Sequence, residues 1–199
     1  MKKLSLILVS LFFLSNSTFA STYSSDPKMF VSELVNDAIS KLSDNNLSKE
    51  EKAAFIENVA IENVDINALS LYTLGELRKS TDKNSLENYQ QAFKKYFLKS
   101  LTSRLTSYSS NKFEIIDAEK KSSNYTIVKS KVIANENQPE IKIDWRVYTK
   151  NPDKPLIRDL IVEGLSLART QKEEFSSILS ANNNDIGILI SELEKFNNN

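Results

Sequence analysis

The chain has 199 residues and equal numbers of basic and acidic side chains, 26 of each. With that balance, and without a basic block interleaved with aromatic residues, a nucleic-acid partner is not expected. The sequence contains no cysteine and no histidine. This excludes disulfides, thiolate nucleophiles, serine–histidine triads and zinc sites built from those ligands. Only three glycines occur, which leaves no glycine-rich phosphate loop.

The first 20 residues have the layout of a secretory signal peptide. Lys2 and Lys3 precede an apolar run from Leu4 to Leu14, and Thr18 and Ala20 supply the small residues of a cleavage site. The run is too short to span a bilayer, and it lacks the polar face of a buried amphipathic helix. We therefore expect an exported protein whose mature part, residues 21–199, is a single domain. Loss of two lysines leaves its net charge near −2.

The mature chain is predicted to begin with helices. Asp26 followed by Pro27 marks the start of the first helix. Ser48 and Glu51 form a capping box for the second. Apolar residues recur at helical spacing behind both starts. They are Phe30, Val31, Leu34, Val35, Ala38, Ile39 and Leu42 in the first helix and Phe55, Ile56, Val59 and Ala60 in the second.

Two more helices are expected before the pattern changes. Asp65 is the expected cap of a third helix that runs through Leu77, and the longest helix covers Ser85 to Tyr108. An aromatic stripe on the longest helix fits either ordinary core packing or contact with a ligand, which periodicity does not separate. Its residues are Leu86, Tyr89, Phe93, Tyr96, Phe97, Leu101, Leu105 and Tyr108.

Four strands follow, rich in β-branched and aromatic residues. In the third strand, one side presents apolar side chains and the other presents Lys142, Asp144, Arg146 and Tyr148, which indicates an antiparallel sheet with one covered face. After Ser166 the helical period returns for two C-terminal helices. The predicted fold is therefore α+β, with helices first, then a curved four-stranded antiparallel sheet, then two helices. The strands are expected over residues 112–120, 124–134, 140–150 and 156–164.

Few groups remain for catalysis. Asp144 and Asp159 lie on consecutive strands and could face each other as an acid–base pair with one raised pKa. Arg146 and Arg158 lie beside them, however, so a cross-strand ladder of ion pairs explains all four residues without chemistry. Gly164 is expected to bend the last strand and does not complete a nucleophile elbow, because no histidine is available as a base.

Five segments in chain order contain motifs of one family. They include Val64-Asp65-Ile66 with Leu74-Gly75 in "VDINALSLYTLGELRK", the helix "YQQAFKKYFLKSLTSRLTSY", Ile143-Asp144-Trp145 in "IKIDWRVY", the segment "DLIVEGLSLARTQKEEF", and "NDIGILISEL" near the end. Together they resemble the MlaC family of periplasmic phospholipid-binding proteins, also described as toluene-tolerance auxiliary components. The chain departs from the family pattern at Leu77, where the family has tryptophan, and at Asn184, where the last motif lacks its first glycine.

The resemblance implies a cystatin- or NTF2-like cone whose sheet and helices enclose a pocket for acyl chains. It implies a periplasmic shuttle that needs no cofactor and carries phospholipid as cargo. The implied partners are an outer-membrane lipoprotein–porin complex and an inner-membrane ABC transporter with an MCE-domain protein, and the implied role is to maintain outer-membrane lipid asymmetry. A non-enzymatic carrier matches a chain without histidine or cysteine.

Candidate lipid-contacting residues come from the aromatic helix, the covered face of the sheet and the third helix. They are Phe93, Phe97, Leu101, Ile143, Trp145, Val147, Leu160 and Val162 for the acyl chains, with Tyr72 and Leu74 at the pocket mouth. Two alternatives stay open at this point. One is an exported NTF2-like hydrolase or isomerase that uses Asp144 or Asp159, and the other is an adaptor with a filled core that binds membrane partners through its surface.

Overall fold

The computed structural model describes residues 23–106, 112–134 and 139–198. The predicted signal peptide and Tyr108 lie outside the described residues. Helices come first: α1 (Pro27–Ser43), α2 (Lys49–Asn63), α3 (Ile66–Leu74), the short 3₁₀ helix η1 (Gly75–Lys79) and α4 (Lys83–Leu105). Strands β1 (Phe113–Ser122), β2 (Tyr125–Val132), β3 (Ile141–Tyr148), β4 (Leu156–Val162) and β5 (Leu165–Ser166) follow, and then helices α5 (Leu167–Ala181) and α6 (Ile186–Asn198).

The helix starts form at the capping residues that the sequence predicts. The Asp26 carboxylate accepts a hydrogen bond from the Met29 N–H at 2.9 Å. Ser48 and Glu51 make both bonds of the capping box, at 2.8 and 3.1 Å. Asp65 caps α3. Each side chain satisfies an N–H group that has no partner inside its helix, which fixes where the helix begins.

One helix end and one strand differ from the prediction. Helix α3 stops at Leu74 instead of continuing through Leu77, because Gly75 adopts φ = 63°, a backbone conformation that ends a helix. The sheet has five strands instead of four. Glu163 and Gly164 both have positive φ, as a two-residue hairpin with a type I′ turn requires, and they turn the chain into the two-residue strand β5. A strand that short leaves no alternating pattern in the sequence.

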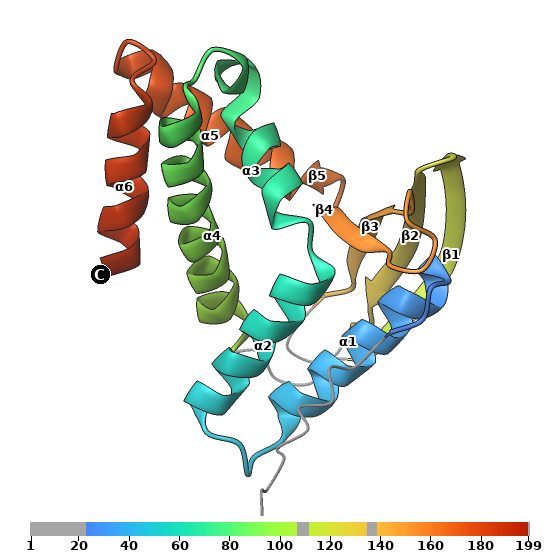
Figure 1. Ribbon diagram of the computed structural model, residues 1–199. Coiled ribbons are helices and arrows are strands. Elements are labelled where there is room, and N and C mark those ends of the chain that lie inside the picture. Colours follow the sequence, from blue (N-terminus) through green and yellow to red (C-terminus); the bar gives the residue numbers. More distant parts are fainter. Residues whose placement is uncertain (1–22, 107–111, 135–138, 199) are drawn as a thin grey trace, which may run out of the picture.

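The sheet is antiparallel throughout, in the order β1-β2-β3-β4-β5. Figure 1 shows α1 lying along one side of the sheet, α3, α4, α5 and α6 gathered as a separate helical layer, and α2 joining the two parts. This arrangement confirms an α+β fold with the predicted order of elements. The closed cystatin- or NTF2-like cone stays a prediction.

Two clusters of buried apolar residues hold these parts together. The sheet cluster lies between α1 and the covered face of the sheet and contains Phe30, Val31, Leu34, Val128, Trp145, Val147 and Ile157. The helical cluster lies among α3, α4, α5 and α6 and contains Ile66, Leu74, Tyr89, Ala92, Phe93, Phe175, Leu179, Leu189 and Leu193. None of the described helices is long and apolar enough to cross a bilayer.

Candidate functional site: an apolar cavity between sheet and helices

A cavity of about 470 Å³ lies between the two clusters. Protein interiors contain few voids larger than a water molecule, so this space is far more than a packing defect. Its volume falls within the roughly 300–1,000 Å³ of small-molecule sites. The lining residues come mainly from α1, α2, α4 and the covered face of β3 and β4, and all but Thr73, Ser100, Arg104, Asp159 and Gln171 are aliphatic or aromatic.

Helices α1 and α2 supply one wall through the apolar stripes that the sequence predicts. Near the start of α1, Phe30 and Val31 are fully packed against the sheet cluster, where Val147 is also fully buried. Further along α1 the stripe changes to residues that line the cavity, among them the small Ala38. Large side chains therefore fill one end of the space beneath the sheet, whereas the stripe borders open space at the other end.

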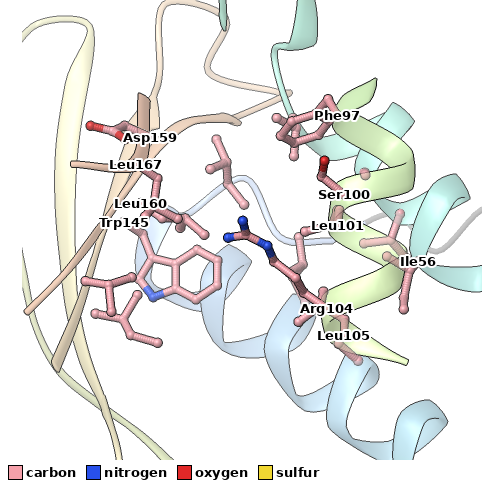
Figure 2. Close-up of a pocket in the computed structure, with 18 of the residues that line it drawn as sticks. Ile56, Phe97, Ser100, Leu101, Arg104, Leu105, Trp145, Asp159, Leu160 and Leu167 are labelled. Atoms are coloured by element: carbon pink, nitrogen blue, oxygen red, sulfur yellow. The ribbon is translucent and has the colours of Figure 1, made fainter. Parts of the chain in front are cut away.

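The opposite wall is the covered face of the sheet, and Trp145 is fixed in it. The indole N–H donates a hydrogen bond to the Ser130 hydroxyl at 2.8 Å, and that hydroxyl donates to the Ile143 carbonyl at 2.8 Å. The indole N–H and the Ser130 hydroxyl therefore both have hydrogen-bond partners, so the ring is buried at little cost in free energy. Figure 2 shows the ring beside Leu160, facing α4 across the cavity.

Helix α4 forms the third wall with one side of its aromatic stripe. Phe93 belongs to the helical cluster and also lines the cavity, and Phe97 stacks on it with ring centroids 6.2 Å apart. Leu101 continues the apolar surface toward the end of the helix. The aromatic stripe therefore has both roles that its spacing allowed. One side packs against helices as ordinary core, and the other side lines the cavity.

Most of the polar groups in the walls are already paired. The Tyr96 hydroxyl donates to the Gln171 amide oxygen at 2.9 Å. The Thr73 hydroxyl lies 2.8 Å from the Tyr89 hydroxyl and also reaches the backbone carbonyls of α3. Burial raises the pKa of Tyr89 well above its ordinary value, although the bond to Thr73 opposes the shift. The phenol therefore stays neutral across the physiological range.

The two candidate catalytic carboxylates do not form a pair. Asp144 lies opposite Ile161 in the β3–β4 register, whereas Arg146 lies opposite Asp159. The Asp159 side chain is 1% exposed and accepts hydrogen bonds from the Ser166 hydroxyl at 2.6 Å and the Ala168 N–H at 3.0 Å. Its oxygens point away from the cavity in Figure 2. Asp159 therefore joins β4 to the start of α5 as a structural anchor.

The predicted ion-pair ladder forms only in part. Arg146 lies 3.7 Å from Asp159, as a ladder requires. Arg158 does not join the ladder and instead pairs with Asp65 at 2.7 Å, with its guanidinium over the Tyr148 ring. A register shift between Arg146 and Val147 leaves Arg158 with no residue opposite it on β3, so the ladder stops at the pair Arg146–Asp159.

Seven of the ten candidate lipid-contacting residues line the cavity. They are Phe93, Phe97, Leu101, Ile143, Trp145, Leu160 and Val162. The other three lie elsewhere: Val147 is packed beneath α1 in the sheet cluster, and Leu74 belongs to the helical cluster. Tyr72 is 42% exposed, with the Lys172 ammonium over its ring, and lines a second depression on another part of the surface.

Sequence reasoning missed the walls contributed by α1 and α2 and the polar residues Ser100 and Arg104. The signal for the first was present in the two apolar stripes, but periodicity does not say which element a stripe faces. Further lining residues that were not proposed include Val64, Leu69, Leu105, Phe113, Val132 and Leu167. In the part of the chain that the structure describes, no cluster of acidic side chains has the geometry to hold a metal ion.

The fold and the cavity together define an α+β protein with a large apolar internal site. Comparison with known proteins gives the family. The chain belongs to the MlaC family, because the model of that family, described as MlaC protein, matches residues 32–195. No curated protein matches the sequence significantly.

A solved structure shares the fold. It is a phospholipid-binding protein from Ralstonia solanacearum in complex with a phospholipid, and it superposes with a TM-score of 0.69. The alignment covers 84% of this chain and 94% of that chain, at 19% sequence identity. At this identity the likeness concerns the fold.

Proposed function

We propose that this protein binds phospholipid in the cavity and carries it between membranes. The observation behind the proposal is the cavity itself, about 470 Å³ enclosed almost entirely by hydrocarbon side chains. Removing an acyl chain from water is favourable by about 0.8 kcal/mol for each methylene, so a carrier must enclose the tails. Membership of the MlaC family and the shared fold with a phospholipid-binding protein support the same cargo.

We further propose that the protein works in the periplasm after cleavage of residues 1–20. Its partners would be the outer-membrane lipoprotein–porin complex and the inner-membrane ABC transporter with its MCE-domain protein, and the carrier would maintain lipid asymmetry of the outer membrane. Family membership and the signal-like layout of the first 20 residues support this assignment. The seven cavity-lining candidates would contact the acyl chains.

The hydrolase alternative finds no support at the site. The Asp159 carboxylate is bound by Ser166, Ala168 and Arg146 and points away from the cavity. Asp144 belongs to the other depression, on the polar side of the sheet. Neither carboxylate is in a position to act on a molecule held inside.

The proposal is tested by filling the cavity. Ala38 is half-buried on α1 and lines the space, whereas Ala54 is exposed on α2 and is not among the lining residues. Ala38→Trp puts an indole where a tail would lie. Moving the indole out of the cavity so that a tail can enter costs roughly 1–3 kcal/mol, which lowers the lipid affinity by about 5- to 150-fold. Ala54→Trp is the matched control and should bind lipid like the unmodified protein.

The measurements are mass spectrometry of lipids extracted from protein purified out of its native compartment, and phospholipid transfer between vesicles. We expect phospholipid with the unmodified protein and with Ala54→Trp, and a clear loss with Ala38→Trp. Equal lipid content in both variants would contradict the assigned site. Absence of both bound phospholipid and transfer activity in the unmodified protein would overturn the function.

A further inference from the structure

Two polar side chains interrupt the hydrocarbon surface of α4. Ser100 and Arg104 lie one helical turn apart, so they share one side of the helix with Phe97 and Leu101, and all four line the cavity. Figure 2 shows the Arg104 guanidinium reaching from α4 across the space toward Trp145 and Leu160, with the Ser100 hydroxyl on the cavity side of the same helix. A positive charge therefore projects into an otherwise apolar site.

This charge has no counter-ion among residues 23–106, 112–134 and 139–198. Arg146 and Arg158 each pair with a carboxylate, but Arg104 forms no salt bridge or hydrogen bond with a described residue, and the Ser100 hydroxyl has none either. The single carboxylate that belongs to the described lining, Asp159, faces away and is already bound by Ser166 and Ala168. The pair can thus offer several hydrogen-bond donors to a ligand.

Arg104 lies where the cavity wall is exposed to water. Among the described lining residues only Arg104 and Leu167 are exposed, and the rest are buried or half-buried. A lipid that enters here with its tails inward keeps its polar group near water while the tails reach Trp145 and Leu160. Arginine is suited to a phosphate group, because its planar guanidinium donates two parallel hydrogen bonds to anionic oxygens.

A simpler role for Arg104 is also available. It lies in the last turn of α4, where a cation interacts favourably with the helix dipole. That interaction needs only the location of the charge near the helix end and does not need the side chain to extend across the cavity. The two roles therefore predict different effects on ligand choice.

We propose that Arg104, assisted by Ser100, binds the phosphate group of the lipid and makes the cavity selective for phosphate-bearing amphiphiles over neutral lipids with the same tails. This inference rests on the proposed function, since it concerns a ligand of the same cavity. It fixes the orientation of the cargo, with the phosphate at the end of α4 and the acyl chains along Phe97 and Leu101. Arg104 is thus a specificity-determining residue.

The test compares two cyclodextrin-solubilised probes with identical tails, dioleoyl phosphatidylglycerol and dioleoylglycerol, by native mass spectrometry of the delipidated mature protein. A charged hydrogen-bonded contact at a partly exposed site is worth about tenfold in affinity. Arg104→Gln should therefore weaken phosphatidylglycerol binding about tenfold and leave dioleoylglycerol binding within about twofold. Arg104→Lys keeps the charge without the paired donors. Its affinity for phosphatidylglycerol should therefore lie between that of the unmodified protein and that of Arg104→Gln.

The matched control is Lys94→Gln, which removes one positive charge from the exposed side of the same helix, away from the cavity. It should bind both probes as the unmodified protein does, whereas a non-specific charge effect would weaken phosphatidylglycerol binding in both variants and overturn the proposal. Unchanged binding in Arg104→Gln, or an equal loss of both probes, would also overturn it.

Two further outcomes separate this inference from the function beneath it. An unmodified protein that binds both probes equally tightly would remain a lipid carrier, but phosphate recognition would be refuted. An unmodified protein that binds neither probe would refute both. Inorganic phosphate alone should not be retained, and retention that depends on Arg104 would reassign these donors to free phosphate.

Discussion

The helical cluster and the cavity are built from the same kinds of residue, yet one is filled and the other is open. In the helical cluster, the Phe175 ring packs edge-on against Tyr89 and Phe93, with centroids 6.4 and 6.2 Å away. The other region has aromatic side chains as well, but Phe97 and Trp145 are held on opposite walls. The comparison shows that the spacing of the supporting elements decides whether an apolar stripe becomes core or pocket.

The physical reason lies in what each set of side chains packs against. Four helices surround the helical cluster, and their side chains interlock from several directions. Between α4 and the sheet, by contrast, α1 and α2 hold the walls apart, and the residues that reach inward include the small Ala38 and Ala60. The side chains of these walls do not fill the gap between them, so the space stays open.

The most direct way to break this comparison is to truncate one phenylalanine in each region of the delipidated protein. Phe175→Ala should lower the free energy of unfolding by about 3–5 kcal/mol, because Phe175 is 2% exposed and its removal leaves a new void. Phe97→Ala should cost less than about 2 kcal/mol, since Phe97 is half-buried and already borders empty space. Urea denaturation measures both values, and equal losses would refute the contrast.

A second experiment tests the link between the two regions. Asp159 ties strand β4 to the start of α5, so Asp159→Asn should lower the free energy of unfolding by about 1.5–3 kcal/mol through loss of charged hydrogen bonds in a buried site. The matched control is Asp144→Asn on the same sheet. Asp144 is half-buried and forms no salt bridge with a described residue, so its change should stay within about 0.5 kcal/mol. A similar loss in both would argue against an anchor at Asp159.

The smallest expected effect concerns α2, which holds one cavity wall. Ser48→Ala removes the cap and should lower the free energy of unfolding by about 1 kcal/mol at neutral pH. The matched control is Ser176→Ala, an exposed serine on α5 that caps no helix. Its substitution should stay within about 0.5 kcal/mol.

The capping box also gives this difference a pH dependence. Hydrogen bonds from Ser48 hold the pKa of Glu51 below its ordinary value. A depressed pKa in the folded state contributes stability that is present above the ordinary pKa and is lost as the pH falls through the folded value. Ser48→Ala keeps the backbone N–H, which is the larger cause of the shift, and loses only the contribution of the hydroxyl. Its deficit should therefore shrink modestly in acid, and urea titrations at neutral and acidic pH measure it. A deficit that grows in acid would contradict the assigned capping box.

Much of the fold follows from local signals that the sequence contains. Asp26, Ser48 and Asp65 set helix starts because their side chains satisfy N–H groups a few residues away. The alternation along Ile141–Tyr148 predicts a sheet with one covered face, which the burial of Trp145 and Val147 confirms. The exceptions are the end of α3, which depends on the positive φ of Gly75, and strand β5, which depends on the positive φ of Glu163 and Gly164. Such short features leave little pattern around them.

The candidate site was harder to predict from the sequence, because it depends on which apolar surfaces meet. Trp145 and Val147 lie on the same face of β3, yet one lines the cavity and the other is packed beneath α1. Arg104 and Lys94 are both cations on α4, yet only Arg104 lines the cavity. Sequence periodicity determined the helices, the strands and their apolar faces, since these follow from interactions within a few residues. Only the tertiary structure decided where those faces meet and where they leave a cavity, because that depends on distances between elements far apart in the chain.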